Sequence, residues 1–178
     1  ERLERGLINN GWLIAGPKGA GKATLAYRLA RAILDPTALV EGGLGMPRDA
    51  RVFRLIAQRA HPDLFVAERL YDEKAKRYQT EITVETIRKL TLFLNRTAPG
   101  GGWRVAIVDC ADNLNQNAAN ALLKSLEEPP AKTAVLLVAN APGRLLATIR
   151  SRCRRIALAP LANDVIEGLL RDELGLEG

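Results

Sequence analysis

The sequence predicts an α/β protein of three layers, in which helices cover both faces of a five-stranded parallel sheet. Short apolar runs alternate with amphipathic helical segments along most of the 178 residues, and this alternation is typical of parallel sheets. A glycine-rich stretch, "GPKGAGK", separates the first apolar run from the first helical segment. Glycine turns in that position join a strand to the helix that follows it.

The first elements flank this glycine-rich stretch. Residues 11–16, "GWLIAG", form an apolar run that suits a buried parallel strand. Apolar residues recur at helical spacing over 22–34, with Arg31 on the opposite face, so we expect an amphipathic helix that ends before a proline. Residues 36–51 hold three Gly and two Pro without periodicity and predict an irregular insertion.

The middle of the chain predicts one strand and one helix. Residues 63–69, "DLFVAER", suit a second strand. The charged stretch 71–79 predicts a mobile connection. Residues 82–96 place apolar side chains on one helical face, and 98–102, "APGGG", predict a turn.

Three more strands alternate with helices in the second half. Residues 103–112 suit a third strand and 133–140 a fourth. The segment 115–128 predicts a strong helix, which two prolines end. A short helix is expected at 143–150, and 152–160 should finish as the fifth strand.

A second domain is expected to begin near the end of the chain. Another helix is predicted from 163 to 174. We therefore divide the chain into an α/β domain at 1–159 and the start of a helical domain at 160–178. The first residue is Glu1 rather than Met, so we expect the chain to be a piece of a longer protein.

The glycine-rich loop has the spacing of a phosphate-binding loop, except at its last position. In such loops backbone N–H groups and the helix N-terminus hold phosphates, a Lys reaches the terminal phosphates, and a Ser or Thr ligates Mg²⁺. Here Ala23 replaces that hydroxyl, and Thr24 lies about 100° further round the helix. The candidate nucleotide-binding residues are Gly16, Pro17, Lys18, Gly19, Ala20, Gly21, Lys22, Ala23 and Thr24. Whether the loop holds ATP or ADP stays open.

A second position also lacks the chemistry of a nucleotide hydrolase. Asp109 follows the third apolar run, where an acidic residue that supports Mg²⁺ is expected. The next residue, where a carboxylate would polarise the attacking water, is Cys110. A neutral thiol cannot act as that base, and Asp112 is a weak substitute three residues later. We therefore expect no ATPase activity from this chain alone.

Composition excludes several classes of protein. No apolar run approaches the ~20 residues that span a bilayer, which favours a cytoplasmic protein. Two cysteines, Cys110 and Cys153, and one histidine, His61, make a zinc site very unfavourable, and we expect reduced thiols. The net charge of +6 permits contact with nucleic acid without indicating it strongly.

Four stretches resemble the clamp-loader branch of the AAA+ proteins, which are P-loop proteins. They are "GPKGAGKATLAYRLARAIL", "VAIVDCADNLNQNAANALLKSLEEPP", "LLVANAPGRLLATIRSRC" and "LAPL". The resemblance runs from about residue 11 to residue 161 and implies an AAA+ fold followed by a helical lid domain. It also implies that the chain is a non-motor subunit, in which a degenerate nucleotide site such as the one at Cys110 is an expected trait.

The resemblance also assigns roles to two further residues. Arg152 lies in "SRC", a family motif whose arginine reaches the nucleotide of the adjacent motor subunit and supports hydrolysis in trans. From composition alone, "RSRCRR" is better interpreted as a solvated basic turn. Asn140 resembles the family's γ-phosphate sensor, and a strand-end cap is an equally good interpretation of it.

Partners follow from the same resemblance. We expect the gamma or tau motor subunits and the delta subunit of a clamp loader, with the sliding clamp contacted indirectly, primer-template DNA bound through the complex, and no membrane. The family usually carries a four-cysteine zinc module after the first helix, but residues 36–62 contain no cysteine, so we expect no zinc. His61, in "HPDL", is interpreted as structural.

Two other functions compete with this interpretation. An active ATPase motor subunit of the same complex would require turnover that Ala23 and Cys110 do not support. A small-molecule phosphoryl-transfer enzyme on a similar scaffold would require a substrate pocket with its own arginines, and it would leave "LLKSLEEPP" and "SRC" without a role.

Overall fold

Five parallel strands form one sheet in the computed structural model, which confirms the predicted architecture. The structure describes residues 10–98 and 100–160, together with residues 162, 165, 167, 168 and 171. In spatial order the strands of the sheet are β2 (Leu64–Ala67), β5 (Arg104–Val108), β6 (Thr133–Ala139), β1 (Gly11–Ala15) and β7 (Arg154–Ala157).

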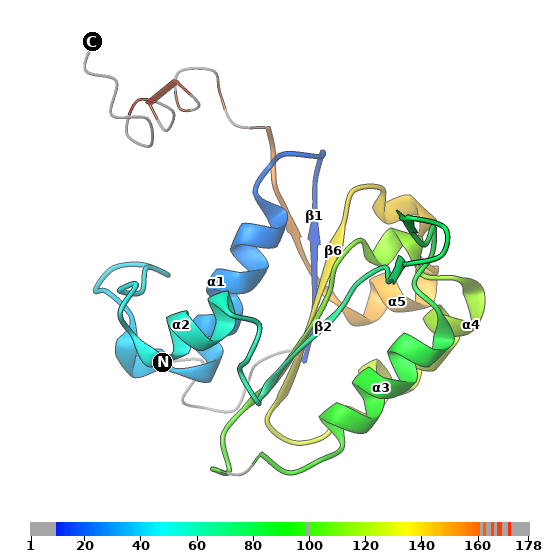
Figure 1. Cartoon of the computed structure of the whole chain (residues 1–178), viewed down its shortest axis with the longest axis horizontal. Helices are drawn as coiled ribbons and strands as arrows, with labels where there is room; N and C mark the ends of the chain where they lie inside the picture. Colours follow the sequence, from blue (N-terminus) through cyan, green and yellow to red (C-terminus); the bar gives the residue numbers. More distant parts are fainter. Residues whose placement is uncertain are drawn as a thin grey trace.

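Helices cover both faces of this sheet (Figure 1). The helices and 3₁₀ turns are α1 (Lys22–Leu34), η1 (Pro36–Ala38), α2 (Arg51–Ala57), α3 (Val84–Leu94), η2 (Ala111–Asn113), α4 (Gln116–Glu127), η3 (Pro142–Arg144) and α5 (Ala147–Arg152). Helices α3, α4 and α5 pack on one face, whereas α1 packs on the other with α2 beside it.

The strands are buried because both faces are covered. Every residue of β5 and β6 is buried, which explains why both read as continuous apolar runs. Successive side chains of β1 alternate between the two cores: Leu13 and Ala15 join the cluster under α3–α5, and Ile14 joins the cluster under α1. The sheet is therefore the shared centre of two hydrophobic cores.

The insertion after α1 is more ordered than predicted. Its last predicted residue begins α2, a seven-residue helix that buries Ile56. The Arg31 guanidinium lies 4.5 Å from the centre of the Phe53 ring, so α2 contacts α1 on a side that the sequence predicted to be polar. Two turns of helix between Gly- and Pro-rich segments are too short to show a clear apolar period.

The charged stretch 71–79 forms a hairpin, which corrects the prediction of a mobile connection. Strands β3 (Tyr71–Asp72) and β4 (Arg77–Tyr78) pair antiparallel, and the two tyrosine rings pack edge to face at 5.2 Å. Asp72 Oδ1 accepts the N–H groups of Lys74 and Ala75 at 2.9 and 3.0 Å, which closes the turn. The tyrosine pair and the aspartate turn are not visible as a strand period in so short a segment.

The elements near residue 150 lie later in the chain than predicted. The helix expected at 143–150 is split into the η3 turn and α5, because the backbone at Leu145 and Leu146 is not helical, with ψ angles of 145° and 137°. Arg150 Nη1 donates to the carbonyls of Pro142, Gly143 and Leu145 across this break. Arg152 consequently ends a helix rather than beginning a strand. The helix predicted at 163–174, and most of the domain predicted at 160–178, lie outside the described residues, so that domain boundary stays a prediction.

None of the helices in the described ranges combines the length and the apolar character needed to span a membrane.

The contact between Gly16 and Leu158 gives a test of this fold. A Cβ placed on Gly16 would lie 2.4 Å from the Leu158 carbonyl oxygen, so Gly16→Ala should lower the free energy of unfolding by about 1–3 kcal/mol. A Cβ on Gly102 meets nothing within 4 Å, and Gly102→Ala should change it by less than about 0.5 kcal/mol. Urea unfolding of the two variants and the parent chain measures this. Equal stabilities for all three would contradict the packing described here.

Candidate functional site

The glycine-rich loop joins the carboxyl end of β1 to the first turn of α1, as the sequence predicted. Gly19 and Gly21 adopt φ angles of 86° and 77°, a left-handed conformation that side chains disfavour. The α1 helix begins directly at Lys22, and the Leu25 N–H donates to the Gly21 carbonyl at 2.9 Å. The loop therefore brings backbone N–H groups to a helix N-terminus, the arrangement that favours anions.

The side chains of this loop are less suited to nucleotide chemistry than its backbone. Lys22 is only 5% exposed, and its ammonium donates to the Pro17 carbonyl within the loop. Ala23 presents a methyl group where a magnesium ligand is expected, and Thr24 is exposed on the next position of the helix. Pro17, Lys18 and Gly19 are exposed, while Ala20 is buried.

Asp109 and Cys110 follow β5 at the same edge of the sheet. The Asp109 N–H donates to the Ala67 carbonyl at 2.9 Å, which extends the pairing between β2 and β5. Cys110 adopts a φ of 57°, unusual for a residue with a side chain, and its Sγ lies 3.8 Å from Asp109 Oδ1. Burial raises the pKa of the Cys110 thiol, and the charges of Asp109 and Asp112 raise this pKa further. The thiol is therefore protonated at neutral pH and cannot serve as a general base.

Asp112 has a structural partner on each carboxylate oxygen. Its Oδ1 accepts the N–H of Asn140 and its Oδ2 accepts the N–H of Ala141, each at 3.1 Å. These bonds tie the turn after β6 to the turn after β5. Asp112 thus caps the end of a neighbouring strand, and Asn140 takes part through its backbone, while its side chain is exposed.

Arg152 lies at the opposite edge of the sheet from the glycine-rich loop. The register pairs Trp12 with Arg154 and Ala15 with Ala157, so α5 ends beside the start of β1. The backbone oxygen of Arg152 lies 3.4 Å from the position of a Cβ on Gly11. Because β1 extends over roughly 15 Å, Arg152 and the loop after Ala15 are separated by the length of the strand.

Two contacts hold the Arg152 side chain. Nη2 lies 2.8 Å from Glu127 Oε1, at the end of α4. Nη1 donates to the Thr148 carbonyl, in the preceding turn of α5, at 3.0 Å. The side chain remains 37% exposed.

Neighbouring residues of "SRC" point in different directions. The Ser151 hydroxyl donates to the Thr148 carbonyl at 3.1 Å, whereas Cys153 packs against the core under α3–α5. Burial raises the pKa of the Cys153 thiol to about 11. The stretch is therefore built into the fold on one side and exposed on the other.

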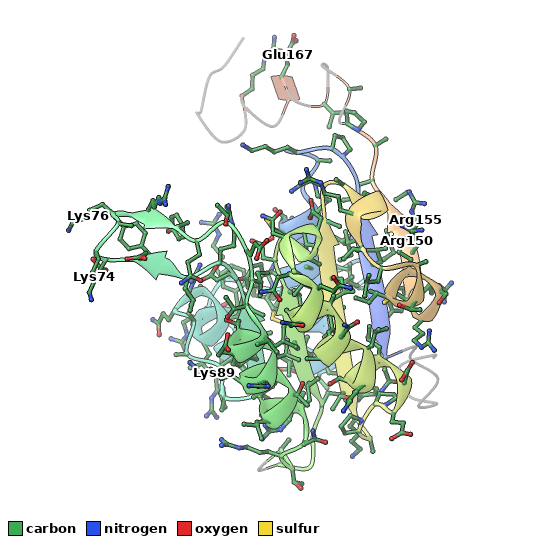
Figure 2. The ribbon with its side chains drawn as sticks, turned by 90° about the vertical axis from the view of Figure 1, so that its right-hand side faces the viewer. Lys74, Lys76, Lys89, Arg150, Arg155 and Glu167 are labelled. Atoms are coloured by element: carbon green, nitrogen blue, oxygen red, sulfur yellow. The ribbon has the colours of Figure 1, made fainter. Side chains whose placement is uncertain are left out.

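Other arginines near this edge have separate partners. Arg154 lies 5.3 Å from the centre of a Trp12 ring, and Arg150 binds three carbonyls of the preceding turn. Figure 2 shows Arg150 and Arg155 together at the side of the molecule where α5 and β7 lie, far from Lys74 and Lys76 on the hairpin. All four arginines of this stretch are exposed, and Arg150, Arg152 and Arg154 also contact other groups of the protein.

Sequence reasoning missed Glu127 as a residue that contacts Arg152. A signal existed, because a carboxylate at the C-terminus of a helix is unfavourable next to the negative end of the helix dipole. It also missed that Asp112 binds the turn after β6. His61, predicted to be structural, accepts the Asp63 N–H on Nδ1 at 3.1 Å, and burial lowers its pKa.

The structure of a known protein resembles this fold. A DNA polymerase III gamma-subunit-related protein from Thermotoga maritima superposes with a TM-score of 0.63 at 23% identity, over 98% of this chain and 53% of that one. At this identity the likeness concerns the fold alone, and it supports the predicted α/β architecture with its five-stranded parallel sheet.

Curated relatives show the family. Residues 1–162 match the family described as DNA polymerase III, delta subunit. The chain is 42% identical to the DNA polymerase III subunit delta' of Pseudomonas aeruginosa, over 80% of this chain and 40% of that protein. It is 40% identical to the delta' subunit of Escherichia coli, over 83% of this chain and 42% of that protein. It thus spans less than half the length of these relatives. The resemblance to clamp-loader proteins is confirmed, and the chain belongs to the DNA polymerase III delta-subunit family, in which these relatives are named delta'.

Proposed function

We propose that this chain is the N-terminal part of a non-catalytic delta' subunit, which helps a clamp loader of DNA polymerase III place the sliding clamp on primed DNA. The subunit contributes an AAA+ domain to the complex and hydrolyses no ATP itself. The relatives named delta' support this role. Because the chain spans less than half of their length, assembly with gamma or tau and delta subunits is part of the proposal, as are DNA contact through the complex and a cytoplasmic location.

The observation that carries the proposal is Cys110, where hydrolysis requires a carboxylate. Its pKa is raised above that of an ordinary thiol, so it neither accepts a proton from water nor presents a negative charge to orient it. Asp109 is assigned to the support of Mg²⁺, so Asp112 is the candidate substitute, and both of its oxygens accept backbone N–H groups.

The loop supports the same conclusion. Ala23 supplies no oxygen to Mg²⁺, and Lys22 donates to the loop's own carbonyl at Pro17. The backbone at Gly19 and Gly21 retains the conformation of a phosphate-binding turn. Binding of ATP or ADP at this degenerate site, with Asp109 and Asn140 at its rim, is compatible with the geometry but is not required for the role. Zinc has no place in the proposal.

Arg152 is the residue proposed to act on a neighbouring subunit. Its place at the far edge of the sheet separates it from this chain's own loop, so its guanidinium is available to a nucleotide on another chain. On that neighbouring chain, the guanidinium can stabilise the negative charge that develops on the transferred phosphoryl group. An active motor subunit of gamma or tau type is the alternative, and it would require hydrolysis at the loop after β1.

The first test concerns the loop. With Mg²⁺ and ATP, the purified chain should release no phosphate above a buffer control, because loss of the magnesium ligand and of the carboxylate each costs orders of magnitude in rate. Lys22→Ala should leave this baseline unchanged. Magnesium-dependent phosphate release that Lys22→Ala abolishes would instead support the motor subunit.

The second test concerns Arg152 in the assembled complex. The full-length protein is combined with its motor and delta subunits, and DNA-stimulated ATP turnover is compared for the native and Arg152→Ala forms. We expect the turnover number to fall by at least about tenfold, the direction seen when an arginine finger is lost. Arg155→Ala, an exposed arginine three residues later, is the matched control and should change turnover less than twofold. An unchanged rate for Arg152→Ala would remove the role in trans.

A further inference from the structure

We propose that Glu127 is the positioning residue of Arg152, which orients the guanidinium that acts on the neighbouring subunit's nucleotide. The inference rests on the role of Arg152 proposed above and extends it to a second residue, on a different helix. It is carried by the 2.8 Å contact between Arg152 Nη2 and Glu127 Oε1.

The two contacts of Arg152 fix the plane of its guanidinium. Thr148, on the same helix as Arg152, binds Nη1 at 3.0 Å, and Glu127 binds Nη2 from the end of α4. A single contact would leave the side chain free to rotate about that bond, whereas two contacts at different nitrogens hold a planar group in one orientation. Guanidinium carries five N–H donors, so donors remain for a phosphate while Glu127 stays bound.

The backbone beneath this pair is firmly packed. Leu126 and Cys153 are the chain neighbours of Glu127 and Arg152, and both pack in the core under α3–α5. A Cβ on Gly11 would lie 3.0 Å from Leu126 Cδ2 and 3.1 Å from Cys153 Sγ. The start of β1 therefore lies against both elements, and the ends of α4 and α5 are held at a fixed spacing. A side chain on such a support is positioned more exactly than one on a free loop.

The position of Glu127 on its own helix is electrostatically unfavourable. It is the last residue of α4, where a carboxylate is disfavoured by the helix dipole. Glu128, the next residue, is also exposed, and in the described part of the chain it forms no ion pair. The stabilising contact of Glu127 is therefore tertiary, and this contact distinguishes two adjacent residues of identical chemistry.

The small energy of the Arg152–Glu127 ion pair limits how much its loss should change ATP turnover. Side chains that are 37% and 45% exposed form an ion pair too weak to govern the stability of the domain. Loss of the pair should allow the guanidinium to occupy several orientations. We therefore expect a partial loss of the assistance that Arg152 gives, on the order of two- to fivefold, and little change in folding.

The experiment uses the full-length protein assembled with its motor and delta subunits, and measures DNA-stimulated ATP turnover. Glu127→Ala should lower the turnover number about two- to fivefold and leave the KM for ATP unchanged, because the finger acts on charge that develops in the transition state. Glu127→Gln, which keeps an oxygen acceptor at the same length, should lose less. Glu128→Ala removes the same charge one residue away and should match the native protein.

A double variant separates positioning from other roles. If Glu127 acts through Arg152, Glu127→Ala should lower turnover no further when Arg152→Ala is already present. Thermal unfolding of each variant checks that the domain folds.

Four outcomes would overturn the proposal. Equal turnover for Glu127→Ala and the native protein, with a loss for Arg152→Ala, would remove the positioning role and leave the function of Arg152 intact. A rise in turnover would show that Glu127 restrains the finger. An additional loss in the double variant would place the action of Glu127 elsewhere. Normal turnover for Arg152→Ala would overturn the underlying function itself.

Discussion

Parallel pairing of β1 with both β6 and β7 is the constraint on which the rest of this structure depends. The register sets Ala15 opposite Ala139 and Ala157, so the three strands end at one level. Segments that follow these strands meet at one edge of the sheet, and segments that precede them meet at the other. The glycine-rich loop and the turn at Asn140 share the first edge, and Arg152 lies at the second. This separation is what makes an action on another chain the natural interpretation of Arg152.

At the edge that carries the glycine-rich loop, the backbone determines the shape of the loop and the side chains determine its chemistry. The shape of the loop depends on the left-handed conformations at Gly19 and Gly21 and on the close approach of Leu158 to Gly16. Its chemistry would depend on a few side-chain atoms at residues 23 and 110, which carry a methyl group and a neutral thiol. Because loop shape and hydrolysis rely on different atoms, hydrolysis can be lost while the shape remains. The proposed non-catalytic role follows from that independence.

At the opposite edge of the sheet, hydrophobic packing supports the charged side chain of Arg152. Leu126 and Cys153 both meet the start of β1 at Gly11, and this contact sets the distance between the ends of α4 and α5. Glu127 and Arg152 project from those ends into partial exposure. A residue of the hydrophobic core thus stands beside each member of the ion pair. The proposed positioning of Arg152 is a consequence of how three elements pack, and not of the sequence around Arg152 alone.

The sequence by itself determined the alternation of elements, because strands buried on both faces read as apolar runs and amphipathic helices read as a 3.6-residue period. It also determined the composition of the loop and the absence of a carboxylate at Cys110. Only the tertiary structure decided the short α2 helix, the hairpin at Tyr71 and the partners of Asp112 and Arg152. The hairpin and α2 are too short to show a period of their own. The partners of Asp112 and Arg152 lie far away in the chain, and no local period records a contact of that kind.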